Sequence, residues 1–403
     1  MNKKIACFLV FLMLLGPFSS AKASDDDTRY LVKSNSAFWK KSFGVRNSFD
    51  DGFTTDASDW QLKLAKIFGV EVEPVKKLNV LPANEIDKTD KIDKSDKVDI
   101  SAKVPAVVLR SKPSDQTPWG VETIYNNQAI TKTSGGSGVN VAILDTGVYK
   151  LHPDLKNRIK DCKDFTQPKP IVEGNCDDKN GHGTHVSGII AADGGNDGLG
   201  IYGVAPEVNL MEYKVCSNSG SCWADDIALA IRTAADNGAN IINMSLGSDA
   251  ESKLIKDGII YATNKKVLVV TAAGNDGPYQ GSIDYPAAQV ESVAVGALDI
   301  NLAVTDWSSR GLNSTTAPYI LEEKDIEFAA PGANIESTWK DGGYVILSGT
   351  SMASPHVAGL AAKLWQKDAI NPALETRNLL RKFSSDLTPV GDDDSSGWGL
   401  PTL

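Results

Sequence analysis

Beyond its amino terminus the sequence lacks a long uncharged apolar run, and this absence argues against a membrane-spanning helix. It also lacks a Cys-x-x-Cys pair, so a zinc site of the knuckle type is not expected. Basic residues are not in excess, because the formal net charge is −10 at pH 7, and this argues against a nucleic-acid partner. The 403 residues are enough for one large core preceded by smaller segments.

The amino-terminal residues have the three parts of a secretory signal peptide. Lys3 and Lys4 supply the positive charge, and residues 5–15 form the apolar part. Residues 21–23, Ala-Lys-Ala, offer a small-x-small cleavage site. We therefore expect residues 1–23 to be removed and the protein to be secreted, to the extracellular space or to a periplasm.

Four cysteines follow the signal peptide, an even number in a chain expected to be exported. Three pairings are possible. The short separations favour Cys162–Cys176 and Cys216–Cys222, each of which would close a polar loop. Four free thiols are the alternative, and the signal peptide argues against it.

Three motifs place an acid, a base and a nucleophile at rigid positions. Asp145 ends an apolar run expected to be a buried strand, while His182 and Ser351 each begin an apolar helical run after a glycine. A serine hydroxyl becomes nucleophilic when a histidine accepts its proton, and a carboxylate fixes the tautomer of that histidine. His182 and His185 could instead suggest a metal site, but metal-binding helices usually place two histidines four residues apart.

These motifs, in the chain order Asp, His, Ser, resemble those of the subtilisin family of serine proteases. The resemblance covers about Trp119 to Leu400. It implies that Asn275, at the end of the run Thr-Ala-Ala-Gly-Asn, donates to the oxyanion of the tetrahedral intermediate.

Strand-like and helix-like runs alternate through the same region. The strand-like runs are residues 139–144, 208–215, 239–246, 267–272 and 293–297, and the helix-like runs are 182–192, 223–237, 251–264, 351–366 and 372–383. This alternation predicts an α/β fold with three layers, a doubly wound and mainly parallel sheet between helices, as in subtilisins. The catalytic groups should lie at the carboxyl ends of the strands.

Residues 24–110 differ in character from the rest. Strand-like and helix-like runs predict a small α+β module, followed at 84–103 by a Lys/Asp-rich repeat that we interpret as a solvated linker. By resemblance this segment is an inhibitory propeptide and residues 111–403 are the catalytic domain, with the first cut expected at Arg110–Ser111. A disordered spacer is the alternative.

The resemblance also implies where a substrate binds. The backbone edge after residue 243 can pair with an extended peptide, which makes polypeptides the substrate class. The residues expected to bind substrate are Ser245, Leu246, Gly247, Ala272, Ala273, Gly274, Asp276 and Asp284.

Two of these residues suggest a specificity. Asp284 falls at the expected floor of the pocket for the side chain before the cleaved bond, and Asp276 falls at its rim. A carboxylate there would attract arginine or lysine. Alternatively, Asp284 points to solvent in a polar loop.

Structural calcium is the expected cofactor, again by resemblance. The residues expected to hold it are Asp115, Asp154, Asp193, Asn196 and Asp197. Their oxygen-rich, glycine-containing loop suits a hard cation, although an Asx-rich turn without metal is the alternative.

The sequence thus predicts a secreted serine endopeptidase made as an autoprocessing zymogen. We expect it to act on polypeptides as a monomer, with its own propeptide as inhibitor. A catalytically silent binding protein of the same fold is one alternative. An esterase or peptide ligase that uses the same three residues is another.

Overall fold

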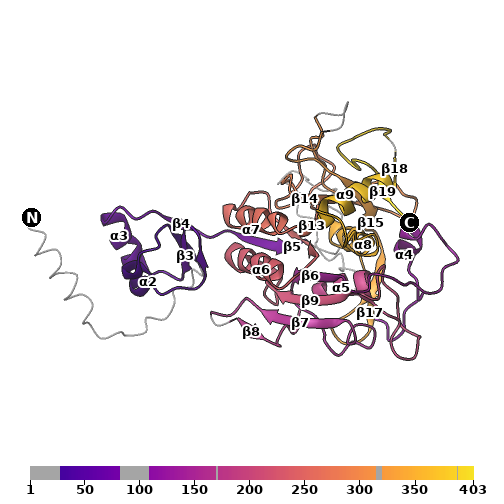
Figure 1. Ribbon diagram of the computed structural model, residues 1–403, viewed down its shortest axis with the longest axis horizontal. Helices are drawn as coiled ribbons and strands as arrows, with labels where there is room; N and C mark the ends of the chain where they lie inside the picture. The colour runs from indigo at the N-terminus through magenta and orange to yellow at the C-terminus, as the bar shows by residue number, and fades with distance from the viewer. Residues whose placement is uncertain (1–27, 82–108, 169–170, 315–319, 388) are drawn as a thin grey trace, which may run out of the picture. The chain divides into compact units, whose positions relative to one another are not determined.

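The computed structural model describes residues 28–81, 109–168, 171–314, 320–387 and 389–403 (Figure 1). The expected signal peptide and the Lys/Asp-rich repeat at 84–103 lie outside these residues. Tertiary contacts divide the chain into two units, one ending at Val75 and the other beginning at Lys76.

In the first unit, four antiparallel strands in the order β2-β3-β1-β4 pack with two helices. The elements are β1 (Tyr30–Val32), α2 (Ala37–Phe43), β2 (Ser48–Phe49), β3 (Gly52–Thr55), α3 (Asp59–Ile67) and β4 (Val72–Pro74). The small core is formed by Val32, Trp39, Phe43, Phe53 and Ala65. This is an α+β module of the kind that the sequence predicts.

An eight-stranded sheet forms the centre of the second unit, in the order β15-β14-β13-β11-β6-β9-β7-β8. Its strands are β6 (Asn140–Asp145), β7 (Ile159–Asp164), β8 (Val172–Glu173), β9 (Asn209–Lys214), β11 (Ile241–Met244), β13 (Leu268–Ala272), β14 (Ser292–Leu298) and β15 (Phe328–Pro331). Every pairing is parallel except that of β8 with β7. Most strand residues are buried, as is expected where helices cover a parallel sheet.

Helices complete the layers. They are α4 (Trp119–Ile124), α5 (His182–Ala191), α6 (Ala224–Asp236), α7 (Lys253–Asn264), α8 (Thr350–Lys363) and α9 (Pro372–Lys382). Helix α5 packs on α8, and α6 packs on α7, with both pairs also in contact with the sheet (Figure 1). The predicted three-layer, mainly parallel α/β fold is confirmed.

A separate three-stranded sheet lies beside the site described below. It has the order β10-β5-β12 and is antiparallel, with β5 (Lys77–Val80), β10 (Ser221–Trp223) and β12 (Leu246–Gly247). The last residues before the Lys/Asp-rich repeat are therefore part of the second unit. Two further antiparallel strand pairs complete the unit: β16 (Ile335–Thr338) with β17 (Tyr344–Leu347), and β18 (Ser384–Ser385) with β19 (Leu400–Pro401).

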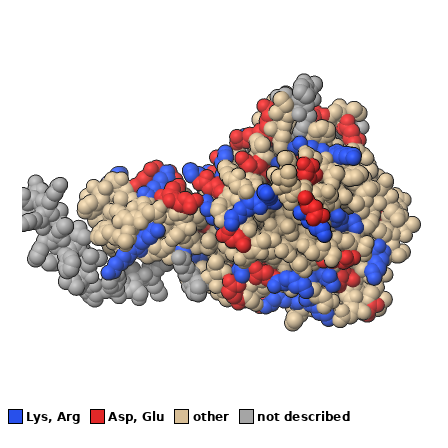
Figure 2. Space-filling view, in the orientation of Figure 1, with Lys and Arg blue, Asp and Glu red and all other residues tan. Residues whose placement is uncertain are grey.

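Charges of both signs are interspersed over the larger unit on the face that Figure 2 shows. No helix in the described part of the chain has both the length and the apolar character needed to cross a bilayer.

Helix α9 is fastened to the sheet by a buried carboxylate. Glu327, which precedes β15, is fully buried and accepts hydrogen bonds from Arg377 at 2.6 and 2.9 Å and from Arg381 at 2.9 Å. Both arginines belong to α9. A buried carboxylate with two guanidinium partners is compensated, whereas loss of the carboxylate would leave two cations at a poorly hydrated interface.

We therefore predict that Glu327→Gln destabilises the protein by about 3–5 kcal/mol, the usual cost of breaking a buried ion pair. Equilibrium unfolding in denaturant measures this. Glu375→Gln, an exposed position on the same helix, is the matched control and should change stability by less than about 0.5 kcal/mol. Equal effects of the two substitutions would contradict the role given to Glu327.

Candidate active site

The three residues with catalytic chemistry come from three elements of the second unit. Asp145 is the last residue of β6, His182 is the first of α5 and Ser351 is the second of α8. All three are buried. Since β6 lies inside a parallel sheet and ends at Asp145, this side chain lies at the carboxyl edge of the sheet, where sites form in open α/β folds.

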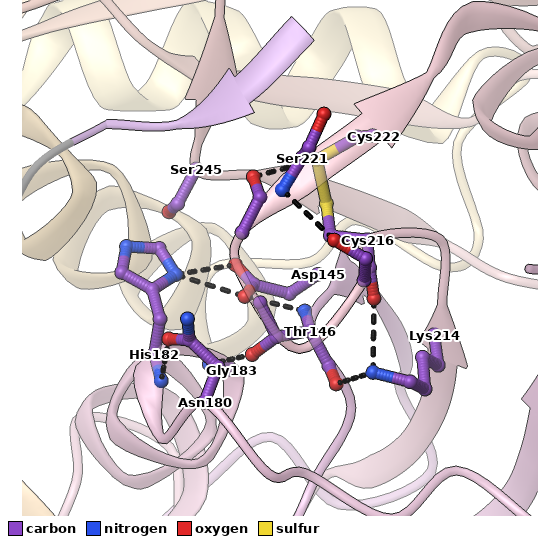
Figure 3. Close-up of a disulfide and its surroundings, with 12 residues drawn as sticks. Asp145, Thr146, Asn180, His182, Gly183, Lys214, Cys216, Ser221, Cys222 and Ser245 are labelled. Atoms are coloured by element: carbon purple, nitrogen blue, oxygen red, sulfur yellow. Dashed lines mark hydrogen bonds and ion pairs between the residues drawn. A yellow bond between two sulfur atoms is a disulfide. The ribbon is translucent and has the colours of Figure 1, made fainter. Parts of the chain in front are cut away.

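The expected acid and the expected base are in direct contact (Figure 3). Nδ1 of His182 lies 2.8 and 2.9 Å from the two carboxylate oxygens of Asp145. Burial lowers the pKa of His182, but the charge of Asp145 and its hydrogen bond outweigh this effect, so that the pKa is raised above its ordinary value. The Asp145 contact thus favours the imidazolium form that a general base passes through.

The expected nucleophile is not hydrogen-bonded to the expected base in this structure. Ser351 Oγ instead donates to the carbonyl oxygen of Ser245 at 3.2 Å. Nε2 of His182 is buried and has no hydrogen-bond partner among the described residues. Catalytic hydrogen bonds are often incomplete in the absence of substrate and tighten when it binds. The missing hydrogen bond between Ser351 and His182 is therefore compatible with a catalytic role for both residues.

A proline within α8 helps to fix Ser351. Pro355 has no N–H, so the Ser351 carbonyl lacks the helical hydrogen bond it would otherwise accept four residues on. The hydroxyl of Ser245 donates to the Ser351 carbonyl oxygen instead, at 2.9 Å. Ser245 is in turn contacted by the side-chain amide of Asn243 at 3.2 Å, so the end of β11 holds the start of α8.

Asn275, the expected oxyanion donor, follows β13 and is oriented by Thr350. Its Oδ1 accepts hydrogen bonds from the Thr350 backbone N–H and hydroxyl, both at 3.0 Å. With Oδ1 engaged, Nδ2 is the end of this side chain that can donate to an oxyanion. Thr350, directly before Ser351, was not identified from the sequence.

Asp178 is a second residue that sequence reasoning missed. Its Oδ1 accepts from the backbone N–H groups of Asn180 and Gly181 at 2.9 and 2.8 Å, and its Oδ2 accepts from Thr184 at 3.0 Å (N–H) and 2.7 Å (hydroxyl). It therefore satisfies donors at the start of α5, where the helix leaves N–H groups unpaired. An aspartate four residues before His182 is the sequence signal that could have indicated this role.

Lys214 joins the residue after Asp145 to the disulfide-bonded Cys216 (Figure 3). Its buried ammonium donates to the carbonyl oxygens of Thr146 at 2.6 Å and Cys216 at 2.9 Å. Burial lowers the pKa of Lys214, against the charges of nearby carboxylates. Cys216 forms a disulfide with Cys222 of β10, and Cys162 forms one with Cys176, so the structure has the pairing favoured by the short separations.

The predicted substrate-binding edge is paired with the chain's own residues. In β5, Val80 is opposite Leu246 and Asn79 is opposite Gly247. On the other side, the N–H of Val80 donates to the carbonyl of Gly220 at 2.9 Å.

Asp284 lies against both backbone segments expected to wall the specificity pocket. A Cβ atom on Gly247 or on Gly274 would lie 2.8 Å from its Oδ2, so only glycine allows this approach. Asp284 is 2% exposed, so the alternative in which it points to solvent is wrong. Ala272 and Ala273 are also buried, whereas Asp276 is exposed.

Some of the residues expected to hold calcium face one another. Oδ1 of Asp154 and Oδ1 of Asp197 lie about 3.0 and 3.4 Å from the position of a Cβ on Gly195, so these two oxygens approach the same part of the loop. The side-chain amide of Gln116, which the sequence prediction omitted, donates to the carbonyls of Gly198 and Gly200 in that loop.

The other expected ligands have different partners. Asp193 is paired with Arg158 at 2.9 Å, and Asn196 accepts from Asn157 at 3.1 Å. Asp115 accepts from the N–H of Thr117 at 3.0 Å. The five residues are thus not brought together as one ligand set.

The remaining histidines of α5 and α8 are bonded to backbone carbonyls of the scaffold. Nε2 of His185 lies 3.1 and 3.0 Å from the carbonyls of Ile335 and Val345, and burial lowers its pKa to about 3. Burial similarly lowers the pKa of His356 to about 4, and its Nδ1 lies 2.8 Å from the Met352 carbonyl.

Comparison with known proteins agrees with this geometry. The model of the subtilase family of peptidases matches residues 136–399. The chain is 46% identical over 383 residues to a subtilisin of a Bacillus species (strain TA39), covering 90% of this chain and 87% of the relative. It is 33% identical over 392 residues to an alkaline protease of Alkalihalobacillus alcalophilus, covering 96% and 94%.

A solved structure agrees as well. Sphericase superposes with a TM-score of 0.70 at 48% identity, covering 72% of this chain and all of that one. Together with the family match, this shows that the chain belongs to the subtilase family of serine proteases, which are enzymes that hydrolyse peptide bonds.

Proposed function

We propose that the protein is a secreted endopeptidase in which Ser351 is the nucleophile, His182 the general base and Asp145 its orienting acid. The contact between Asp145 and Nδ1 of His182 carries this proposal, because it leaves Nε2 as the nitrogen that can take a proton. The proposal extends to the residue before the cleaved bond, for which we expect arginine or lysine.

In the first step Ser351 Oγ attacks the peptide carbonyl while Nε2 of His182 takes the hydroxyl proton. Asn275 Nδ2 and the Ser351 backbone N–H donate to the resulting oxyanion, assisted by the positive end of α8. His182 then gives its proton to the leaving amine, and the acyl-enzyme forms. Water, activated by the same histidine, releases the second product.

The chain's own residues support a zymogen. Strand β5 lies on the edge that an extended peptide would use, so it would block substrate until it is displaced. Arg110, the expected end of the propeptide, exchanges backbone hydrogen bonds with Tyr344 at 3.0 and 2.8 Å, and its guanidinium lies 2.9 Å from Glu336. A cut after Arg110 would need these contacts to open, and a cut closer to Leu81 is the alternative.

We predict that Ser351→Ala accumulates with residues 24–110 attached, because the same site makes the first cut. Activity should fall by roughly 10⁶-fold. Mass spectrometry of the secreted protein reports both the loss of the signal peptide and the position of each later cut. Maturation of Ser351→Ala with unchanged timing would show that another protease performs it.

Fluorophosphonate labelling separates this function from the alternative of a silent binding protein. Wild-type enzyme should be labelled at Ser351, and Ser351→Ala should not. Absence of label in the mature wild type would exclude the enzyme. An esterase would show itself by hydrolysing an ester but not the matched peptide amide.

We predict that Asp145→Asn lowers kcat by about 10⁴-fold, as loss of the acid does in serine proteases. The wild-type kcat/KM should rise with pH through a pKa above 6.5, because Asp145 raises the pKa of His182 and only neutral His182 acts as base. In the variant this acid limb should move to lower pH. Asp368→Asn, at an exposed position, is the control. An acid limb that does not move would rule out His182 as the titrating base.

Calcium is the cofactor we propose, held by Asp154 and Asp197 with Gln116 and loop carbonyls. This proposal is supported by the approach of one carboxylate oxygen each from Asp154 and Asp197 to the same glycine-rich loop. When bound there, the ion would fix the loop between α5 and β9. Asp193 is not among the proposed ligands, because its carboxylate is paired with Arg158.

We predict that chelation lowers the thermal midpoint of the Ser351→Ala protein, in which autolysis cannot interfere. A cation bound only by the folded state at 100 times its Kd stabilises it by about 2.7 kcal/mol. Asp154→Asn and Asp197→Asn should each reduce the difference between excess calcium and excess chelator. Identical melting curves of the Ser351→Ala protein in excess calcium and in excess chelator would remove calcium from the proposal.

A further inference from the structure

Three carboxylates from separate segments converge beside the substrate edge. One oxygen from each of Asp249, Asp276 and Asp284 lies within 4.8 Å of the other two. Asp249 follows β12, Asp276 follows Asn275, and Asp284 lies in the loop between β13 and β14. We call these three residues the aspartate cluster. Like charges at this separation repel one another, so the arrangement favours a cation.

Within the cluster, Asp284 is both buried and incompletely bonded. Its side chain is 2% exposed, and its Oδ1 has no hydrogen-bond partner among the described residues. Its backbone is fixed, because its N–H donates to the Ala273 carbonyl at 2.8 Å and its carbonyl accepts from Ala288 at 2.9 Å. A buried acceptor without a donor is costly unless a ligand supplies one.

The electrostatics agree with the geometry. Burial, the charges of Asp276 and Asp249, and a side-chain hydrogen bond with Asp249 together raise the pKa of Asp284 to about 7, and burial is the largest of these causes. These two residues are the charged groups that act on Asp284, one from the segment after β13 and one from that after β12. A bound cation would reverse the effect by favouring the carboxylate.

The cluster is close to the reacting groups. Asp284 contacts Gly247, two residues from Ser245, whose carbonyl accepts from Ser351 Oγ. It also contacts Gly274, the neighbour of Asn275. A side chain that enters between these two glycines would therefore belong to a residue next to the cleaved bond.

We propose that the aspartate cluster binds the ammonium or guanidinium group of a lysine or arginine side chain immediately before the cleaved bond, with Asp284 at its base and Asp249 and Asp276 at its opening. This inference rests on the proposed protease function. It adds Asp249, which sequence reasoning did not identify, as a specificity-determining residue.

A cationic side chain fits the cluster better than a metal ion. Guanidinium carries five N–H donors in a planar fork and can bond several carboxylate oxygens at once. Calcium takes six to eight oxygens, whereas one carboxylate oxygen from each of the three residues converges in the cluster. Among the described residues, no lysine or arginine is among the groups that shift the pKa of Asp284.

Two peptides derived from residues 77–81 test the inference. They are Lys-Leu-Asn-Val-Leu and Lys-Leu-Asn-Val-Arg, each as the p-nitroanilide, and differ only in the residue before the cleaved bond. Mature enzyme should hydrolyse the arginine peptide with a kcat/KM at least ten times that of the leucine peptide. This ratio should rise between pH 6 and pH 8 as Asp284 ionises, and the titration of His182 cancels because both peptides use it.

Three variants locate the effect. Asp284→Asn should lower the ratio at least tenfold, and Asp249→Asn and Asp276→Asn should lower it severalfold, in each case mainly through a lower kcat/KM for the arginine peptide. Asp368→Asn should leave the ratio unchanged. Asp284→Asn keeps the size of the side chain and removes a buried charge, so its melting temperature should equal or exceed that of the wild type.

The outcomes separate this inference from the proposed function. If neither peptide is cleaved, both fail. If the leucine peptide is cleaved at least as well as the arginine peptide and Asp284→Asn leaves the ratio unchanged, the protease function of Ser351, His182 and Asp145 stands, while the arginine or lysine preference and the cation-binding role are both overturned. Competitive inhibition of the arginine peptide alone by micromolar calcium, absent in Asp284→Asn, would show that the cluster is a metal site and would also overturn it.

Discussion

The contact between the Asp145 carboxylate and Nδ1 of His182 is the interaction on which the rest of the site depends. It joins a central strand to a helix across a region from which water is excluded, since both side chains are at most 4% exposed. In such surroundings a charge without a partner is costly, whereas a well-bonded pair is tolerated. The surrounding residues therefore have to hold the pair in a single geometry.

Several polar residues around the pair serve that requirement. Asp178 satisfies N–H groups at the start of α5 and also accepts from the Thr146 hydroxyl at 3.0 Å. That hydroxyl accepts in turn from the N–H of Gly183 at 2.9 Å. Lys214 holds the Thr146 carbonyl from the other side. The residue after the acid and the residue after the base are thus linked directly, which fixes both ends of the contact.

How much the sequence predicts depends on whether the signal is local. Asp145, His182 and Ser351 each stand at the boundary of an apolar run, so the strand and helix patterns that determine the fold also place them correctly. Partners that meet only through tertiary folding were not predictable. Asp249 lies in a different segment from Asp284, and no periodic pattern connects the two.

The calcium loop shows the same limit. The resemblance to subtilisins groups five oxygen-bearing residues as calcium ligands. In the structure, however, Asp193 is paired with Arg158, and Asn196 accepts a hydrogen bond from Asn157. Whether a polar side chain faces a ligand or a neighbour depends on which donors fold against it. Composition and spacing do not contain that information. The same reasoning explains why Gln116, whose partners are backbone carbonyls, was missed.

Buried carboxylates in this protein illustrate three ways of meeting the cost of burial. Glu327 accepts hydrogen bonds from two arginines. Burial raises the pKa of Glu212 well above its ordinary value, and the Ser187 hydroxyl donates to one of its oxygens at 2.8 Å. Asp284 has neither an arginine partner nor a pKa so far from neutrality. A cation bound beside Asp284 would favour its carboxylate form, and this response suits a residue that recognises a cationic side chain.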